Sequence, residues 1–357
     1  MRRLEIVQIG LGHVGRAVAQ IVLEERKRLL ERRGVEVRYR AVSDTSGALV
    51  GEDLLPQAVR LKEDGGRLSE LGTVPLEDVL RSEPEPGFTR VVVDVAVHGG
   101  TFDLDLLGIE NGSYLVLSNK GPLSGSTAEY ERLVNRVPDR LWHEATVGAG
   151  MPIISTLGGL IETGDEILEI QASPSGTLGF VMSAVEAGRS FSEAVREAVE
   201  LHYAEPDPRD DLSGLDVARK AIILARMMRR RIEPEEIPYE SLVPEGLEDV
   251  RLDEFMARLP DHDEAFAARM KAVKDHHMLR YLTSIPKEGP VTVGLAETPV
   301  ESPFGPISGP ENVFDFRTRR YSDVTLTVRG PGAGPERTAS GVVWDLLDIA
   351  HRALKDD

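Results

Sequence analysis

The chain has 357 residues, a formal net charge of −18 and no cysteine. Such an acidic chain is a poor partner for nucleic acid or an anionic membrane surface, and without cysteine it forms neither disulfides nor thiolate metal sites. With 41% hydrophobic and 29% charged residues, the composition is that of a globular protein large enough for two or three domains. The lack of cysteine fits a cytoplasmic protein. We expect no signal peptide, because the sequence begins directly with a strand-like run, and no transmembrane helix, because no apolar run approaches 18 residues.

The first predicted strand, Leu4–Ile9, leads directly into the glycine pattern Gly10-Leu-Gly12-His-Val-Gly15. A helix is predicted over residues 16–33, with Gly34 ending it. In this order, the first glycine makes a tight turn, the second lets the backbone approach a pyrophosphate, and the third allows close helix–strand packing. The sequence therefore predicts a dinucleotide-binding domain, and the alternative is a glycine-rich turn without a ligand.

A second strand, Val35–Val42, ends at Ser43-Asp44. We expect the Asp44 carboxylate to accept the ribose hydroxyls of a bound adenosine. Because no arginine directly follows Asp44, NAD is favoured over NADP. Arg38 and Arg40 on the same strand keep NADP open, since guanidinium groups bind phosphate well. The alternative role for Asp44 is that of a simple turn residue.

Two further strands carry the next candidate site. Val91–Val97 is almost entirely apolar, as in a strand buried on both faces of a parallel sheet. The strand Tyr114–Leu117 ends near Asn119-Lys120, and ligands bind outside the carboxyl ends of such strands. A lysine there can hold a substrate carboxylate or carbonyl, although a lone lysine is more often a solvated loop residue. Short helices are predicted at 76–82 and 102–110.

The segment from Trp142 to Pro152 is rich in small residues and poor in charge. Its Glu144 could join exposed backbone carbonyls to hold a hard cation. The alternative is a buried carboxylate that caps backbone N–H groups.

The second half begins with a predicted strand at 168–172 and a small polar turn, Ser173–Thr177. Later strands, with Pro and Gly turns between them, predict an antiparallel sheet. His202 stands where a left-handed residue would end a helix. A last helix is expected to return and complete the dinucleotide-binding domain. The helices are predicted at 178–187, 191–201 and 342–354, a helical insert at 244–274, and the later strands at 278–284, 291–296 and 324–328.

The most informative stretch runs from Glu205 to Lys220, where acidic residues surround two prolines before an apolar helix. Ser213 and Asp216 resemble a capping box, and the helix is predicted to continue to Arg231. Asp216 and Lys220 lie four residues apart, so both fall on the mostly apolar, inward face. The alternative reading is an intrahelical ion pair beside a solvated acidic loop.

These segments resemble homoserine dehydrogenase, and the resemblance covers nearly the whole chain. Its most specific parts are Asn119-Lys120, His143–Gly150, Glu205–Lys220 and Gly332–Thr338. The form resembled is the short one without a regulatory domain, and the region 203–220 is similar to fungal members. The implied fold is α/β, with a Rossmann-type dinucleotide-binding domain and an α+β catalytic and dimerisation domain. The implied boundaries are 1–142 with 335–357 for dinucleotide binding, 143–151 with 284–334 for dimerisation, and 152–283 for catalysis.

The resemblance implies reversible reduction of L-aspartate 4-semialdehyde to L-homoserine with NAD(P)H, on the route to threonine, methionine and isoleucine, in a homodimer. Lys220 would donate the proton to the aldehyde oxygen, and Lys120 would polarise the same centre. The implied substrate residues are Glu205, Asp211, Asp216, Gly176 and Thr177. The implied cofactor residues are Gly10, Gly12, His13, Val14, Gly15, Asp44, Ala96, Lys120 and Gly334. The implied structural sodium site consists of Glu144 and the backbone carbonyls of Val147, Ala149 and Met151.

Two other functions remain open from the sequence. One is a related dehydrogenase of another amino-acid semialdehyde or oxo acid, against which the Glu205–Lys220 stretch argues. The other is a non-catalytic nucleotide-binding regulator, which would not need both lysines. In every case we expect a small-molecule partner rather than nucleic acid or a membrane.

Overall fold

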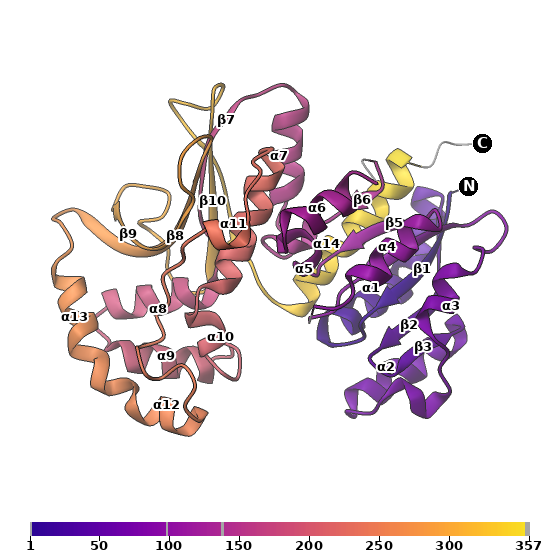
Figure 1. Ribbon diagram of the computed structural model, residues 1–357, viewed down its shortest axis with the longest axis horizontal. Helices are drawn as coiled ribbons and strands as arrows, with labels where there is room; N and C mark the ends of the chain where they lie inside the picture. Colours follow the sequence, from indigo (N-terminus) through magenta and orange to yellow (C-terminus); the bar gives the residue numbers. More distant parts are fainter. Residues whose placement is uncertain (1, 98, 137–138, 354–357) are drawn as a thin grey trace. The chain divides into compact units, whose positions relative to one another are not determined.

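The computed structural model describes residues 2–97, 99–136 and 139–353. The chain folds into two compact units, each with its own internal packing (Figure 1). The first unit comprises Met1–Pro152 together with Ala333–Asp357, and the second comprises Ile153–Gly332.

A six-stranded sheet forms the centre of the first unit, in the order β3-β2-β1-β4-β5-β6. All neighbouring strands are parallel except β3, which forms an antiparallel hairpin with β2. This hairpin was not predicted, because its short second strand follows a Thr-Ser-Gly turn directly. The strands are β1 (Arg2–Ile9), β2 (Val35–Asp44), β3 (Gly47–Val50), β4 (Thr89–Asp94), β5 (Tyr114–Leu117) and β6 (Leu141–Trp142).

Helices cover this sheet and close its core. The first begins at His13, three residues earlier than predicted, and ends as predicted at Gly34, whose φ of 66° is left-handed. The predicted short helices at 76–82 and 102–110 are also present. The helices are α1 (His13–Arg33), α2 (Leu55–Glu63), α3 (Leu76–Arg81), α4 (Phe102–Glu110), α5 (Gly121–Ser124), α6 (Thr127–Val134) and α14 (Pro335–Asp348), with 3₁₀ turns η1 (Glu52–Leu54), η2 (Leu68–Leu71) and η3 (Glu144–Thr146).

The C-terminal helix α14 packs beside α1 in the first unit (Figure 1). It starts at Pro335, seven residues before the predicted start, because proline suits the first turn of a helix. Val342 and Leu346 are buried in the same apolar core as Leu4 and Ile6 of β1. A π-helical segment, η6 (Ile349–Ala353), follows α14.

The second unit contains a five-stranded sheet, in the order β11-β10-β7-β8-β9, with every neighbouring pair antiparallel. The predicted antiparallel sheet is therefore correct, but β10 was missed. Its buried Val313, Phe314 and Phe316 do not alternate strictly with polar residues, and a Pro/Gly-rich loop precedes it. The strands are β7 (Ile167–Ser173), β8 (His277–Pro286), β9 (Thr292–Pro299), β10 (Glu311–Thr318) and β11 (Leu326–Pro331).

Helices α8 and α11 both contact this sheet, and α9 lies beside α8 (Figure 1). His202 follows α9 in the predicted left-handed conformation, with φ 56°. The predicted helical insert at 244–274 contains two short α-helices. The helices are α7 (Ile153–Glu162), α8 (Gly176–Glu186), α9 (Phe191–Glu200), α10 (Arg209–Leu212), α11 (Leu215–Met227), α12 (Leu252–Arg258) and α13 (Asp263–Lys271), with 3₁₀ turns η4 (Pro234–Glu236) and η5 (Leu259–His262).

Helix α11 differs from its prediction at both ends. The predicted Ser213 capping box is wrong, because the N-cap is Gly214 in a left-handed conformation, with φ 76°. A Cβ at Gly214 would overlap the hydroxyl of Tyr281, so only glycine fits there. The helix ends at Met227 instead of 231, just before Arg229, whose φ is 62°.

The fold class predicted from the sequence is confirmed, since a parallel Rossmann-like sheet and an antiparallel sheet are both present. No helix in residues 2–97, 99–136 and 139–353 is both long and apolar enough to cross a membrane.

Candidate active site

The glycine turn between β1 and α1 is shaped by close backbone approach. Gly10 has a φ of 97°, and a Cβ there would lie 3.0 Å from the backbone nitrogen of Ala96. A Cβ at Gly15 would overlap the carbonyl oxygen of Gly10. A Cβ at Gly12 would meet no atom within 4 Å, so this position faces open space. Gly10 and Gly15 thus serve the fold itself, whereas Gly12 leaves room for a ligand to approach the backbone.

A buried glutamine holds this turn. The Gln8 amide donates hydrogen bonds to the carbonyls of Gly10 at 2.8 Å and Gly15 at 3.0 Å. The hydroxyl of Tyr39 on β2 donates to the Gln8 side-chain oxygen at 2.8 Å, so the amide orientation is fixed. Burial, with a smaller contribution from Glu52, raises the pKa of Tyr39, which keeps this hydroxyl a donor.

The first turn of α1 has the properties of an anion site. Its N-cap, Gly12, supplies no side-chain acceptor, and no acidic residue lies in the first turn. The first N–H groups of a helix have no partner within the helix, and the helix dipole favours negative charge at this end. The turn can therefore receive a phosphate at the point that Gly12 leaves open.

Asp44 ends β2 and is held by several donors. Its Oδ1 accepts hydrogen bonds from the backbone and hydroxyl of Ser46, and its Oδ2 accepts from Lys62 Nζ at 2.9 Å and Leu68 N at 3.1 Å. Burial alone raises the pKa of Asp44, but hydrogen bonds from Ser46, Lys62 and Leu68 outweigh it and hold the pKa below its usual value. Asp44 is therefore an ionised acceptor with a lysine beside it.

The two arginines that kept NADP open lie on β2. The guanidinium of Arg38 forms ion pairs with Glu36 and Glu85 and lies 4.7 Å from the ring centre of Phe88. Arg38 is thus engaged by other groups, and Lys62 is the cation that the structure places against Asp44.

A buried network joins β4 to the segment that carries Lys120. Asp94 accepts hydrogen bonds from Ala96 N at 2.9 Å, Thr101 Oγ1 at 2.7 Å and Asn119 Nδ2 at 2.9 Å. The backbone carbonyl of Asp94 also accepts from Asn119 N at 3.2 Å. This network fixes Asn119 and therefore the position of its neighbour Lys120.

A second carboxyl group, Asp105 on α4, is completely buried beside Asp94. Within the described residues, neither oxygen of Asp105 meets an N–H or O–H donor. Burial, followed by the neighbouring charge of Asp94, raises the pKa of Asp105 well above its usual range. A proton on Asp105 is the donor that can join the two carboxyl groups.

The candidate cation segment surrounds a buried turn in the first unit. Glu144 is 3% exposed, and its backbone N–H donates to Asp345 of α14 at 2.9 Å. Burial raises the pKa of Asp345 well above its usual range, and the charge of Glu144 adds to this effect. Ala149 has a φ of 57° and follows left-handed Gly148, so the chain turns sharply among the carbonyls of this segment.

In the second unit, the predicted substrate residues lie together. Asp211 on α10 accepts the backbone N–H of Glu205 at 2.9 Å and contacts the Thr177 hydroxyl at 3.0 Å. The same hydroxyl donates to the carbonyl of Tyr203 at 2.6 Å. Burial raises the pKa of Asp211, and the charges of Glu205 and Asp216 raise it further. Asp211 is therefore the carboxyl group that contacts the first turn of α8, and Glu205 and Asp216 lie near enough for their charges to act on it.

Lys220 projects from α11 into this cluster. Its side chain is only 10% exposed, and its Nζ lies 2.7 Å from Asp216 Oδ2 and donates to the carbonyl of Pro174 at 2.7 Å. An ammonium group carries three N–H donors, and these contacts use two of them. The ion pair of the alternative reading thus exists, with the Lys220 side chain 10% exposed and the Asp216 side chain 43% exposed.

Comparisons with known proteins test the family resemblance seen in the sequence. A family model described as "Homoserine dehydrogenase" matches residues 152–347. The homoserine dehydrogenase of Saccharomyces cerevisiae is 33% identical over 98% of both chains. The chain belongs to the homoserine dehydrogenase family. The resemblance seen in the sequence is therefore confirmed.

Two further relatives place the chain within this family. The chloroplastic bifunctional aspartokinase/homoserine dehydrogenase 1 of Zea mays is 38% identical over 96% of this chain, which spans only 38% of that relative. A hyperthermophilic archaeal homoserine dehydrogenase in complex with NADPH has a similar structure, with a TM-score of 0.75, 26% identity and 99% coverage of both chains.

Several residues that shape these sites were not found from the sequence. Gln8 and Asp94 are buried polar residues inside nearly apolar strands. A polar residue in such a strand needs hydrogen-bond partners, and this could have marked both residues from the sequence. Lys62 gave no signal, because it pairs with Asp44 across 18 residues of chain. Arg226 on α11 is also buried, at 4% exposed, and its guanidinium donates to the carbonyl of Ile232 at 3.0 Å.

Proposed function

We propose that this homoserine dehydrogenase family member catalyses the reversible NAD(P)H-dependent reduction of L-aspartate 4-semialdehyde to L-homoserine. The observation that carries the proposal is the buried ammonium of Lys220, held by Asp216 and by the carbonyl of Pro174. It stands among Glu205, Asp211 and Thr177, which were assigned to the substrate.

Lys220 has the chemistry that a general acid needs. The aldehyde oxygen gains negative charge as its carbon is reduced, so a nearby ammonium group both stabilises the oxygen and transfers a proton to it. In the oxidation direction, the neutral amine accepts the proton of the homoserine hydroxyl. Because Lys220 projects from a helix and has two fixed contacts, its amino group is oriented before the substrate arrives.

The carboxyl groups suit the other end of the substrate. A zwitterionic amino acid needs anions for its ammonium group, and Glu205, Asp211 and Asp216 are such groups in the second unit. Its carboxylate needs a cation, and we assign this role to Lys120, which also polarises the carbonyl.

The first unit has the features of a dinucleotide site, with an open position at Gly12 and an uncapped helix start at α1. The bound nicotinamide would supply or accept the hydride. Asp44 suits the ribose hydroxyls of NAD, whereas Lys62 beside it offers a cation to the 2′-phosphate of NADP. We therefore propose that both cofactors are used.

We also propose a structural sodium ion at Glu144 and the carbonyls of Val147, Ala149 and Met151. The donors fit, because carboxylate and carbonyl oxygens are the ligands of hard cations. A cation would also offset the repulsion between Glu144 and the buried Asp345. Protein refolded without sodium should lose activity and its dimeric state, and full retention of both would count against the site.

We further propose a cytoplasmic homodimer, with the dimer contacts in residues 143–151 and 284–334. An absence of cysteine fits a reducing compartment, where disulfides are rare. Light scattering should give twice the mass of the chain, and a monomer at micromolar concentration would reject the dimer.

The proposed reaction is tested by NAD(P)H formation from L-homoserine at alkaline pH. Other amino alcohols and hydroxy acids serve as competing substrates. Preference for homoserine supports the proposal, and preference for another substrate identifies the related dehydrogenase instead. Dinucleotide binding without turnover of any of these substrates would favour the non-catalytic regulator.

A further inference from the structure

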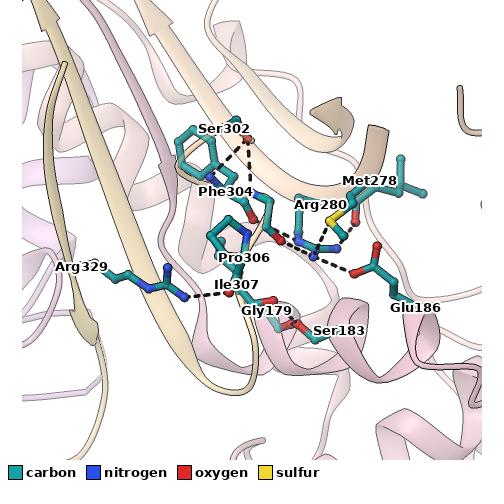
Figure 2. A network of polar contacts seen from close by, with 12 residues as sticks. Gly179, Ser183, Glu186, Met278, Arg280, Ser302, Phe304, Pro306, Ile307 and Arg329 are labelled. Carbon is teal, nitrogen blue, oxygen red and sulfur yellow. Dashed lines mark hydrogen bonds and ion pairs between the residues drawn. The ribbon is translucent and has the colours of Figure 1, made fainter. Parts of the chain in front are cut away.

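Arg280 on β8 is the most deeply buried arginine described in the second unit, with 1% of its surface exposed. Its guanidinium donates to the carbonyls of Phe304 at 3.2 Å and Gly305 at 2.8 Å, both in the loop between β9 and β10. It also pairs with Glu186 of α8 at 2.7 Å. Figure 2 shows the guanidinium group pointing toward both the loop and the helix. One side chain therefore joins three elements of this unit.

The loop, residues 300–310, lies along one face of α8. Near the middle of the helix, the Ser183 hydroxyl donates to the carbonyl of Ile307 at 3.0 Å (Figure 2). Toward its start, Cβ atoms at Gly179 and Gly176 would lie 3.2 Å from the carbonyl of Glu311 and 3.1 Å from that of Pro310. The helix positions 176, 179, 183 and 186 are three or four residues apart, so they form a single face. The loop is thus packed along the helix from its last turn to its first.

The loop is also well ordered by its own contacts. Phe304 and Ile307 are buried with Val313 in a small apolar cluster. The Ser302 hydroxyl accepts the N–H groups of Phe304 and Gly305 at 3.3 Å and 3.2 Å. A change at Arg280 should therefore move the whole loop and should not disorder a single residue within it.

The first turn of α8 carries Gly176 and Thr177, which the proposed function assigns to the substrate. Thr177 contacts Asp211 at 3.0 Å, and Asp211 in turn holds Glu205. We propose that Arg280 is a positioning residue for substrate binding: it presses the 300–310 loop against α8 and so sets the place of Thr177 in the acidic cluster. This inference rests on the proposed function and adds a residue that touches no substrate.

Arg280→Met is the direct test. The KM for homoserine should rise by about tenfold or more, the change expected when a charged hydrogen-bond donor is lost. The KM for the dinucleotide should stay within about twofold, because its site lies in the other unit. The matched control is Arg226→Met, which removes another buried arginine of the same unit, on α11. If Arg280 had only a structural role, both variants would lose folded protein while the remaining enzyme kept its KM for homoserine.

A milder variant covers the case in which Arg280→Met does not fold. Ser183→Ala removes one contact between helix and loop and leaves the arginine in place. It should raise the KM for homoserine by about two- to tenfold, the range for one neutral hydrogen bond. An unchanged KM in Ser183→Ala and in a folded Arg280→Lys would overturn the inference.

Hydrogen exchange separates this inference from the proposed reaction. In Arg280→Met, the amides of residues 176–178 and of the 300–310 loop should exchange faster than in wild type, whereas Arg226→Met should leave them unchanged. Wild-type protein that lacks homoserine turnover would reject the proposed reaction alone. If the amides of residues 176–178 and 300–310 exchange at the same rate in Arg280→Met and Arg226→Met, the positioning role of Arg280 is rejected, whichever substrate the enzyme uses.

Discussion

The Gly10–Gly15 turn of the first unit depends on the absence of side chains. The Thr177–Lys220 cluster of the second unit depends instead on the charge of its side chains. The turn is defined by backbone atoms so close that a Cβ would overlap them at Gly15. The cluster is defined by an ion pair and by hydrogen bonds among ionisable groups. Substitutions in the turn should therefore act through space and stability, and those in the cluster through chemistry.

Lys220→Ala should give the largest effect, and it tests the chemical half of this comparison. Without its general acid the enzyme should lose about 10²- to 10⁴-fold in kcat, while dinucleotide affinity stays nearly unchanged. Steady-state kinetics and a fluorescence titration with NADPH measure the two quantities. Lys287→Ala is the matched control, since Lys287 forms an exposed ion pair with Glu166 in the same unit. A Lys220→Ala enzyme with wild-type kcat would show that the assigned role is wrong.

Gly15→Ala and Gly12→Ala test the steric half. The new methyl group at Gly15 overlaps the carbonyl of Gly10, so unfolding free energy should fall by about 1–3 kcal/mol, as in other overpacked sites. At Gly12 the φ of −74° suits alanine and the space is open, so stability should stay within about 0.5 kcal/mol of wild type. Dinucleotide affinity should nevertheless fall in Gly12→Ala. Urea unfolding measures the stability of both variants, and NADPH titration measures their dinucleotide affinity. Equal stability losses in both variants would contradict the assignment of Gly15 to the fold and Gly12 to the ligand.

These two regions also differ in how far the sequence predicted them. The turn was predicted from local sequence, because the strand, the glycine pattern and the helix follow one another directly along the chain. Asp216 and Lys220, at a spacing that also suits an ordinary ion pair, gained their role only through the resemblance to a family. The contact of Asp211 with Thr177 spans 34 residues, and no local pattern indicates such a distance. Gly214 was missed for the same reason, because its need for glycine comes from Tyr281.

The fold was predicted best where the pattern is local and regular. Strand β5 and helix α4 have their predicted bounds, since each is a short apolar run between clear turns. Strand β10 was missed because its pairing with β7 and β11, not its own alternation, determines its conformation. Tertiary pairing of this kind overrides local preference.

Asp105→Asn tests an effect of charge in the first unit, where Asp105 is completely buried beside Asp94. Because the pKa of Asp105 is raised in the folded protein, the folded state binds more protons than the unfolded state above the ordinary aspartate range. Stability should therefore fall as pH rises through the folded pKa, by at most about 1.4 kcal/mol per pH unit for one proton. Asparagine keeps a donor toward Asp94 but cannot titrate, so this slope should disappear.

Urea unfolding between pH 5 and pH 8 measures the Asp105 effect. Asp253→Asn is the control, since Asp253 is exposed and its pKa is lowered by a hydrogen bond from Arg251. If wild type and Asp105→Asn have the same pH dependence, the two buried carboxyl groups do not share a proton in the folded protein.

Lys62→Met should give the smallest effect, and it asks whether charge also matters at the edge of the first unit. Lys62 is 20% exposed beside Asp44, so solvent partly screens it, and its loss should raise the KM for NADP by about 3- to 10-fold, or about 1 kcal/mol. The KM for NAD should change less, because NAD lacks the 2′-phosphate. Arg38→Met is the matched control, since its guanidinium is engaged by Glu36 and Glu85. A change in cofactor preference in Arg38→Met but not in Lys62→Met would show that Arg38 on β2, and not Lys62, binds the 2′-phosphate. Asp44 would then bind the ribose hydroxyls without help from Lys62.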